Sequence, residues 1–173
     1  MGEQPIGLDM PSRKVVKYYK MHGLLEQPEE LQTGILIEVT GQLKGSFLFM
    51  LSEAFTKTVI NTILGEEERN LTSLDDMECS LISELGNIMC GSYIRALSQL
   101  MDMDMDVSVP ELCIDMGGAI LTYPMSKWVI VSDDILLIEN IFHMSGEIFK
   151  GRILILPEQE DLGTMLSRLR VQR

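Results

Sequence analysis

Basic residues are scarce in this sequence. It has 14 Lys and Arg against 26 Asp and Glu, which gives a formal net charge of -12. Binding along a nucleic-acid backbone requires a basic patch, and so does attraction to an anionic membrane surface. The charge balance therefore argues against nucleic acid and membrane as main partners. It fits a protein partner that offers at least one positive group.

Cysteine pairs and long apolar runs are also missing. Cys79, Cys90 and Cys113 are odd in number and widely spaced, without a CxxC motif, which argues against a zinc knuckle and a disulfide framework. Free thiols are typical of a reducing compartment. The apolar run at 128–138 is broken by two aspartates and is too short to span a bilayer. With no signal peptide at its start, we expect a soluble, cytoplasmic protein.

Motifs for two common chemistries are absent as well. The pair Gly117-Gly118 lacks the Lys-Ser/Thr that completes a phosphate-binding loop. The alternating Met and Asp of 101–106 resemble a calcium loop, but Val107 and Cys113 stand where that loop needs Gly and Glu. We therefore expect no metal site and no nucleotide site in this chain.

Strand and helix patterns fill most of the chain. Residues 34–40 and 45–51 are predicted to form strands joined by a turn at 41–44. A helix is expected from Ser52 to about Leu64, where Gly65 ends it. A second and unusually long helix is predicted over 74–101, capped by Ser73. Its apolar face is predicted at Leu81, Leu85, Ile88, Ser92, Ala96 and Leu100. Extended structure is expected at 106–115, 119–124, 127–132, 134–142 and 150–156. A short helix is expected from about Glu158. Residues 1–30 show only weak patterning.

The chain also repeats itself. Residues 41–51 return at 146–156 with one residue inserted, and each copy is expected to be a hairpin followed by a helix. A proline precedes each copy, Pro11 and Pro110. We therefore expect one α/β (α+β) domain over residues 1–173, with about six antiparallel strands in pseudo-twofold halves and long helices on one face. The first half lacks the long helix of the second, in the protein itself or only in the stretch of sequence at hand.

One row of residues on the long helix stands out. Ser80, Glu84, Asn87 and Gly91 are spaced four, three and four apart, which places them along one side of a helix and off its apolar stripe. A glycine inside a helix costs roughly 1 kcal/mol relative to alanine, and it often marks a close approach by another group. Gly91 would leave room beside the Asn87 amide. An exposed Glu and Asn on a helix are most often a solvated face, so the row alone leaves both interpretations open.

The row and its surroundings resemble the CheC/CheX/FliY family of chemotaxis phosphatases. That family's pattern is Asp or Ser, three residues, Glu, two residues, Asn, 22 residues and Pro, and Ser80, Glu84, Asn87 and Pro110 match it. The segments 84–88, 91–93, 96–98 and 115–121 are similar to the second half of CheC, and the likeness extends from about residue 34 to the end. CheC proteins usually carry the motif twice, so the chain resembles a single-site variant.

The resemblance implies a phosphatase that accelerates hydrolysis of the aspartyl phosphate on a CheY-type response regulator in bacterial chemotaxis. Asn87 would position the attacking water, Glu84 would pair with a regulator lysine, and Ser80 and Gly91 would belong to the docked surface. An amide suits this task because it both accepts and donates hydrogen bonds. The Mg²⁺ beside the acyl phosphate belongs to the regulator, so the chain needs no cofactor of its own.

The same resemblance leaves a non-catalytic role open. CheC proteins bind the receptor deamidase CheD, and the flagellar switch proteins FliM and FliY share the fold. FliM-type members lack the Glu/Asn pair, which this chain keeps, and this favours catalysis with CheD as an additional partner. The segment Asp115 to Pro124, with its small Gly117 and Gly118, is a candidate docking region for CheD. A strand pair with a tight turn explains that segment equally well.

Overall fold

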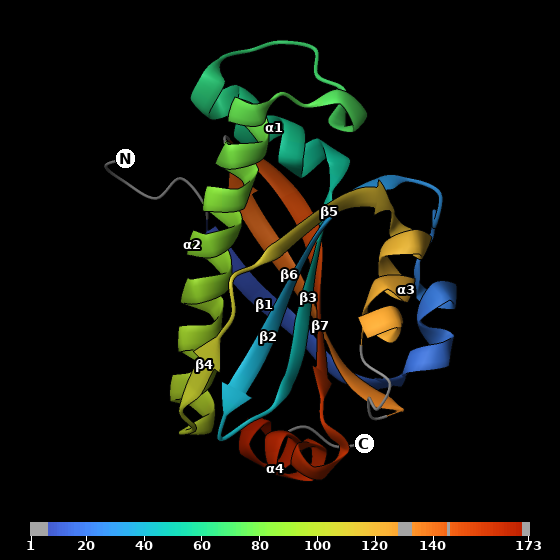
Figure 1. The fold of residues 1–173 in the computed structure, drawn as a ribbon, viewed down its shortest axis with the longest axis vertical. Coiled ribbons are helices and arrows are strands. Elements are labelled where there is room, and N and C mark those ends of the chain that lie inside the picture. Colours follow the sequence, from blue (N-terminus) through green and yellow to red (C-terminus); the bar gives the residue numbers. More distant parts are fainter. Residues whose placement is uncertain (1–6, 128–132, 145, 171–173) are drawn as a thin grey trace.

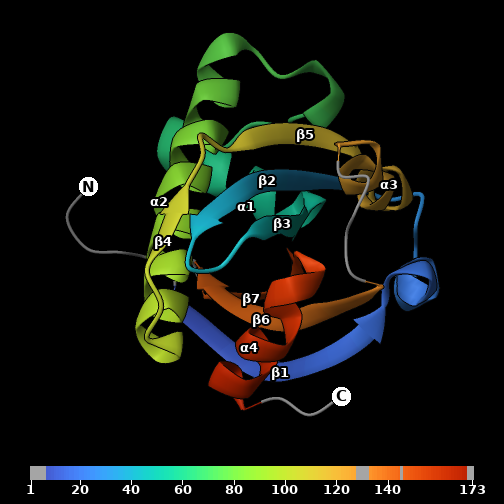
Figure 2. The same ribbon diagram turned by 60° about the horizontal axis from the view of Figure 1, so that its bottom comes forward.

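The described residues of the computed structural model, 7–127, 133–144 and 146–170, form one antiparallel sheet of seven strands (Figure 1). The strands are β1 (Gly7–Lys17), β2 (Leu31–Gly41), β3 (Gly45–Ser52), β4 (Met105–Val107), β5 (Glu111–Met116), β6 (Asp134–Met144) and β7 (Glu147–Pro157). Their order is β1-β6-β7-β3-β2-β4, and β4 and β5 pair with opposite ends of β2. Figure 2 shows β1 and β5 at the two outer edges. The expected antiparallel α+β class is confirmed.

The two halves of the sheet are related hairpins. β2–β3 is followed at once by α1 (Glu53–Leu64), and β6–β7 is followed at once by α4 (Gln159–Leu169). The hairpins meet where β3 pairs with β7 in the middle of the sheet. Each hairpin has an outer strand with an irregular register near a proline, around Pro11 in β1 and around Pro110 between β4 and β5. The predicted internal repeat is therefore confirmed in the strand pairing.

Local sequence signals account for the elements that were predicted best. The strands expected at 34–40 and 45–51 are the inner parts of β2 and β3. The Ser52 hydroxyl accepts a hydrogen bond from the Phe55 N–H at 3.2 Å, which caps α1 as expected. Gly65 follows the last turn with φ of 104°, a conformation that favours glycine. α4 begins directly after Glu158.

Helices cover both faces of the sheet. α1, α4 and the long helix α2 (Asp76–Met101) pack on one face, where the buried strand residues include Ile35, Ile37, Phe47, Phe49, Leu136, Ile138, Ile153 and Ile155. The helix α3 (Gly117–Lys127) and the 3-10 helix η1 (Tyr18–Leu24) pack on the other, where they include Leu36, Leu48, Leu137 and Leu154. Helices on one face were expected, and this is right for α1, α2 and α4 only.

The prediction of extended structure at 119–124 was wrong, because these residues lie within α3. A short apolar run does not distinguish a buried strand from a buried helix by its periodicity. The adjacent residues Ile120 and Leu121 are both 1% exposed and pack in the core cluster on the α3 side of the sheet. Of the strand expected at 127–132, Lys127 ends α3 and residues 128–132 lie outside the described ones.

The segment 1–30 was expected to be only weakly patterned, but it contains the strand β1 and the 3-10 helix η1. β1 pairs with β6, more than a hundred residues later in the chain. Proline is tolerated in a strand at a sheet edge or at a register irregularity, and Pro11 occupies both. Pro11 is therefore compatible with the strand.

The start of α2 is set by Asp75 and not by Ser73. The Asp75 carboxylate accepts from the Glu78 N–H at 2.8 Å, and Glu78 accepts from the Asp75 N–H at 2.9 Å, a reciprocal capping box. Ser73 instead ends the short 3-10 helix η2 (Leu71–Ser73). The predicted end of α2 at Met101 is confirmed, with Asp102 in a left-handed conformation.

None of the helices in the described ranges is long and apolar enough to cross a bilayer.

Candidate functional site

The four residues of the row lie on the outer side of α2. Ser80, Glu84 and Asn87 are exposed, and Gly91 is half-buried. Glu84 and Asn87 are three residues apart and therefore neighbours on the helix surface, less than one turn from each other. Within the described residues, neither the Glu84 carboxylate nor the Asn87 amide forms a hydrogen bond or an ion pair. Both functional groups are therefore available to a partner.

The buried side of α2 differs from the predicted apolar face. The prediction is right for Leu85, which is 9% exposed, but Ile88 and Leu100 are 38% and 52% exposed. The buried apolar side chains of α2 are Ile82, Leu85, Cys90, Tyr93, Ile94, Leu97 and Met101. The prediction followed one line of apolar residues and missed the line that continues through Tyr93 and Met101. Ile88 was thereby assigned to the core, although it lies on the side of the row.

The two glycines of α2 have different surroundings. A Cβ at Gly86 would lie 2.9 Å from Cδ1 of Ile35, so this glycine lets α2 approach β2 closely. A Cβ at Gly91 would meet no atom within 4 Å. Packing inside the chain therefore explains Gly86 and gives no reason for Gly91. The free space beside Gly91 lies on the outside, next to the row.

Contacts at both ends hold α2 in place. At its start, the buried Arg69 guanidinium pairs with the Glu78 carboxylate and donates to the Asn61 side-chain oxygen at 2.6 Å, which joins α1 to α2. At its end, the Arg168 guanidinium of α4 donates to the Met101 carbonyl at 3.2 Å. The row is thus carried on a helix whose backbone is fixed at two points about 35 Å apart along the axis.

Burial keeps two titratable side chains on the inner side of α2 neutral. It raises the pKa of the Cys90 thiol to about 12 and also raises the pKa of the Tyr93 hydroxyl. Both groups are therefore neutral near pH 7. The Tyr93 ring packs edge-on against Phe49 of β3 at 5.8 Å between ring centres. Neither side chain reaches the row, so the chemistry available there comes from Glu84, Asn87 and Ser80.

The shape of this site limits what it can act on. Small-molecule sites are concave and bury most of their ligand, whereas the row lies on the convex surface of a helix. A carboxylate and an amide on such a surface act on a group that a second macromolecule brings to them. The described residues contain no cluster of three or more His, Cys, Asp or Glu side chains that could hold a metal ion.

The other predicted site residues lie apart from the row, at the junction of β5 and α3 (Figure 1). Asp115 is exposed, whereas Gly117 is buried and Gly118 is half-buried. The N–H groups of the two glycines donate to the carbonyls of Glu30 and Pro28, each at 2.9 Å. Gly117 and Gly118 therefore hold the 28–30 loop against α3, and Asp115 is the accessible member of this group.

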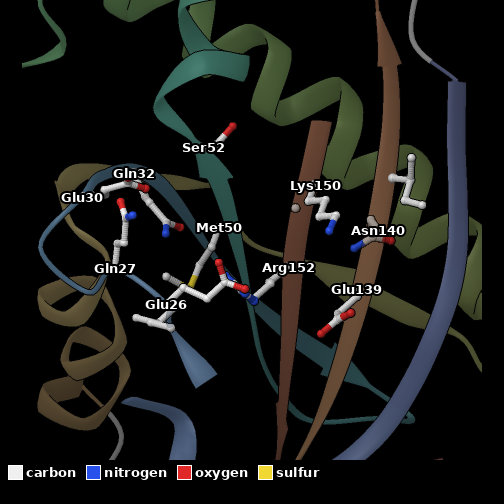
Figure 3. A pocket seen from close by; sticks show the side chains of 13 residues that line it. Glu26, Gln27, Glu30, Gln32, Met50, Ser52, Glu139, Asn140, Lys150 and Arg152 are labelled. Atoms are coloured by element: carbon white, nitrogen blue, oxygen red, sulfur yellow. The ribbon is translucent and has the colours of Figure 1, made fainter. Parts of the chain in front are cut away.

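A polar cleft of about 500 Å³ opens on the α3 side of the sheet (Figure 3). Its charged lining residues are Glu26, Glu30, Glu139, Lys150 and Arg152. Three separate segments supply them, so no local motif could have predicted the cleft. None of the predicted site residues lines it. Its mixed charges form no recognisable catalytic arrangement, and α2 holds the stronger candidate site.

Comparison with known proteins finds similarity to CheC-like proteins. A model of the CheC-like family matches residues 77–114, a segment that contains Ser80, Glu84, Asn87 and Pro110. The chain is 26% identical over 168 residues to the CheY-P phosphatase CheC of Bacillus subtilis, a match that covers 95% of this chain and 80% of that protein. It is 32% identical over 108 residues to the CheY-P phosphatase CheX of Thermotoga maritima, covering 59% and 66% of the two chains. The crystal structure of Thermotoga maritima FliY superposes with a TM-score of 0.71 at 20% identity, covering 95% of this chain and 82% of that one.

Proposed function

Because this chain belongs to the CheC-like family, which includes CheC, CheX and FliY, we propose that it is a phosphatase for the aspartyl phosphate of a CheY-type response regulator. The observation that carries this proposal is the pair Glu84 and Asn87, exposed side by side on α2 and without partners among the described residues. The pair lies inside the segment that the family model matches. We place the reaction in the cytoplasm, in keeping with the three free cysteines.

The proposed chemistry needs only positioning by this chain. A water oxygen bonds to phosphorus while the bond from phosphorus to the aspartyl oxygen breaks, which releases inorganic phosphate and restores the regulator's carboxylate. Phosphoryl transfer requires little covalent help, so orienting the water and stabilising charge are the main tasks. The Asn87 carbonyl oxygen accepts from the water, and its NH₂ group donates toward the phosphoryl oxygens.

Glu84 has a different task in this proposal. Its carboxylate pairs with a lysine of the regulator near the acyl phosphate and thereby sets the register in which Asn87 meets the water. A charge-assisted pair that forms only on docking is stronger once the interface excludes water. Ser80, one turn before Glu84, adds a hydroxyl to the docked surface. The Mg²⁺ is held by the regulator, and this chain supplies no ligand to it.

The decay rate of a phosphorylated CheY-type regulator in Mg²⁺ buffer tests the proposal. The protein should accelerate decay, and Asn87→Ala should reduce that acceleration by about a hundredfold or more, the usual cost of one positioning group. Gln99→Ala is the matched control, because it removes an exposed amide from the same helix away from the row. Full activity of Asn87→Ala, or an equal loss with Gln99→Ala, would contradict the assignment.

We further propose that the deamidase CheD docks at the junction of β5 and α3. Asp115 is exposed there and the next residue, Met116, is 46% exposed, whereas the glycines behind them are engaged in internal contacts. An acidic and an apolar side chain at the start of a helix form a small accessible feature that a partner can contact. Titration with purified CheD tests this, because Asp115→Ala should weaken binding. An unchanged affinity would move the docking site elsewhere.

A further inference from the structure

Two large apolar side chains flank the pair Glu84 and Asn87 on α2. Met77 is 66% exposed and Ile88 is 38% exposed. Met77 precedes Glu84 by seven residues and Ile88 follows it by four, spacings that place all three on the same side of a helix. At a rise of 1.5 Å per residue, Met77 and Ile88 are about 16 Å apart along the axis, with Glu84 and Asn87 between them.

Single exposed apolar residues are normal on a protein surface and need no explanation. The arrangement here is different because the two apolar side chains enclose the proposed catalytic pair. Gly91 adds to it, since the space beside this glycine is empty and lies one turn beyond Asn87. The outer side of α2 therefore has a polar pair, one apolar side chain before this pair and one directly after it, and open space beside Ile88 at Gly91.

The size of a docked partner brings these side chains into the interface. A stable protein interface buries about 800 Å² on each partner, which is a disc of roughly 16 Å radius. Measured from a point midway between Glu84 and Asn87, Met77 lies about 13 Å along the axis and Ile88 about 4 Å. A globular protein that brings an acyl phosphate to Asn87 on this convex surface therefore covers both side chains.

We propose that Met77 and Ile88 are docking residues for the phosphorylated response regulator, and that they fit apolar side chains on two sides of its phosphorylation site. This rests on the proposed phosphatase function. Buried at the interface, the two side chains lose contact with water and contribute binding energy on two sides of the carboxylate–amide pair. The partner surface is accordingly apolar at two places and carries its positive group opposite Glu84.

This division of labour has a kinetic signature. Apolar docking contacts are made equally in the ground state and in the transition state, so their loss raises KM and leaves kcat unchanged. Truncation of a side chain that anchors an interface costs about tenfold in affinity or more. Loss of Asn87 acts on the reacting water and lowers kcat. Docking and chemistry are thus separable on one helix face.

The test measures phosphate release over a range of phosphorylated-regulator concentrations. Met77→Ala and Ile88→Ala should each raise KM about tenfold with kcat within about twofold of the unchanged protein. Alanine keeps the helix propensity high, and Ile88→Leu should restore KM by restoring apolar area. Leu100→Ala is the control on the same helix, since Leu100 is 52% exposed and lies about 160° around the axis from Glu84. Ile148→Ala, at a residue 66% exposed on β7, is the control on another element.

The outcomes separate this inference from the function on which it rests. If Met77→Ala and Ile88→Ala keep the original KM while Asn87→Ala loses kcat, the phosphatase stands and the docking assignment is wrong. If Leu100→Ala raises KM as much as Ile88→Ala does, the effect is not specific to the row and the assignment is again wrong. If the unchanged protein does not accelerate decay at all, the proposed function fails and the docking inference fails with it.

Discussion

The two sides of α2 carry side chains in opposite situations. On the inner side, Leu97 is 1% exposed and Tyr93 is 4% exposed, and both pack in the core cluster with the sheet. On the outer side, Glu84 and Asn87 have no partner among the described residues. The inner side fixes the position of the helix, and the outer side presents functional groups that the chain itself does not use. The comparison predicts that changes on the two sides have separable effects on stability and on activity.

The largest expected effect is a loss of stability on the inner side. Leu97→Ala should lower the free energy of unfolding by about 2–5 kcal/mol, because it leaves a cavity among packed side chains. Asn87→Ala should change it by less than about 0.5 kcal/mol, since its side chain is exposed. Urea unfolding measures both values. A destabilised Asn87→Ala would break the comparison, because its loss of activity could then follow from unfolding.

The outer side of α2 was predictable because helical periodicity alone determines it. Ser80, Glu84, Asn87 and Gly91 share one side of any helix that spans them, whatever packs behind it. The inner side was not predictable in the same way, because it depends on how the sheet meets the helix. Ile88 shows the difference, since an apolar residue at helical spacing was assigned to the core and lies on the outside.

In the fold as well, the elements specified by neighbouring residues were predicted, and those that depend on distant residues were not. β2, β3 and α1 follow from turn residues and caps within a few positions, and the repeat doubles that signal in β6, β7 and α4. β1 was missed because its pairing partner, β6, is distant in the chain and Pro11 conceals the pattern. α3 was misassigned because a short apolar run is compatible with both helix and strand until its packing surface is known.

A smaller effect on stability is expected from the inner side of α2 when the pH is raised. Burial raises the pKa of the Cys90 thiol from 9.0 to about 12. Between these values the unfolded chain releases the proton and the folded chain keeps it, so the free energy of unfolding falls as the pH rises above 9. At pH 10.5 this group should cost about 2 kcal/mol relative to pH 7.5.

Cys90→Ala removes this contribution and isolates it. Tyr93, whose pKa burial also raises, titrates in both proteins, so the difference between them belongs to Cys90. Urea unfolding at pH 7.5 and 10.5 should show a loss about 2 kcal/mol smaller in Cys90→Ala than in the unchanged protein. Equal losses in both would mean that the thiol is not held in the core as the structure places it.

The smallest expected effects come from the two glycines and sharpen the comparison most. Gly86→Ala gains about 1 kcal/mol of helix propensity but forces Cδ1 of Ile35 to move from 2.9 Å, an overpacking that costs about 1–3 kcal/mol. The expected net result is a loss of about 1 kcal/mol in stability. Gly91→Ala meets no atom within 4 Å and should raise stability by up to about 1 kcal/mol.

Activity should follow the opposite order. The methyl group of Gly91→Ala projects into the space beside Asn87 that a docked regulator is proposed to fill, so the more stable variant should be the slower phosphatase. Gly86→Ala leaves the outer side of α2 unchanged and should keep its rate at temperatures where it stays folded. Unfolding and decay assays on both variants decide the matter. A Gly91→Ala variant that is both more stable and fully active would mean that this glycine leaves room for no partner, and the docked surface would then have to end before Gly91.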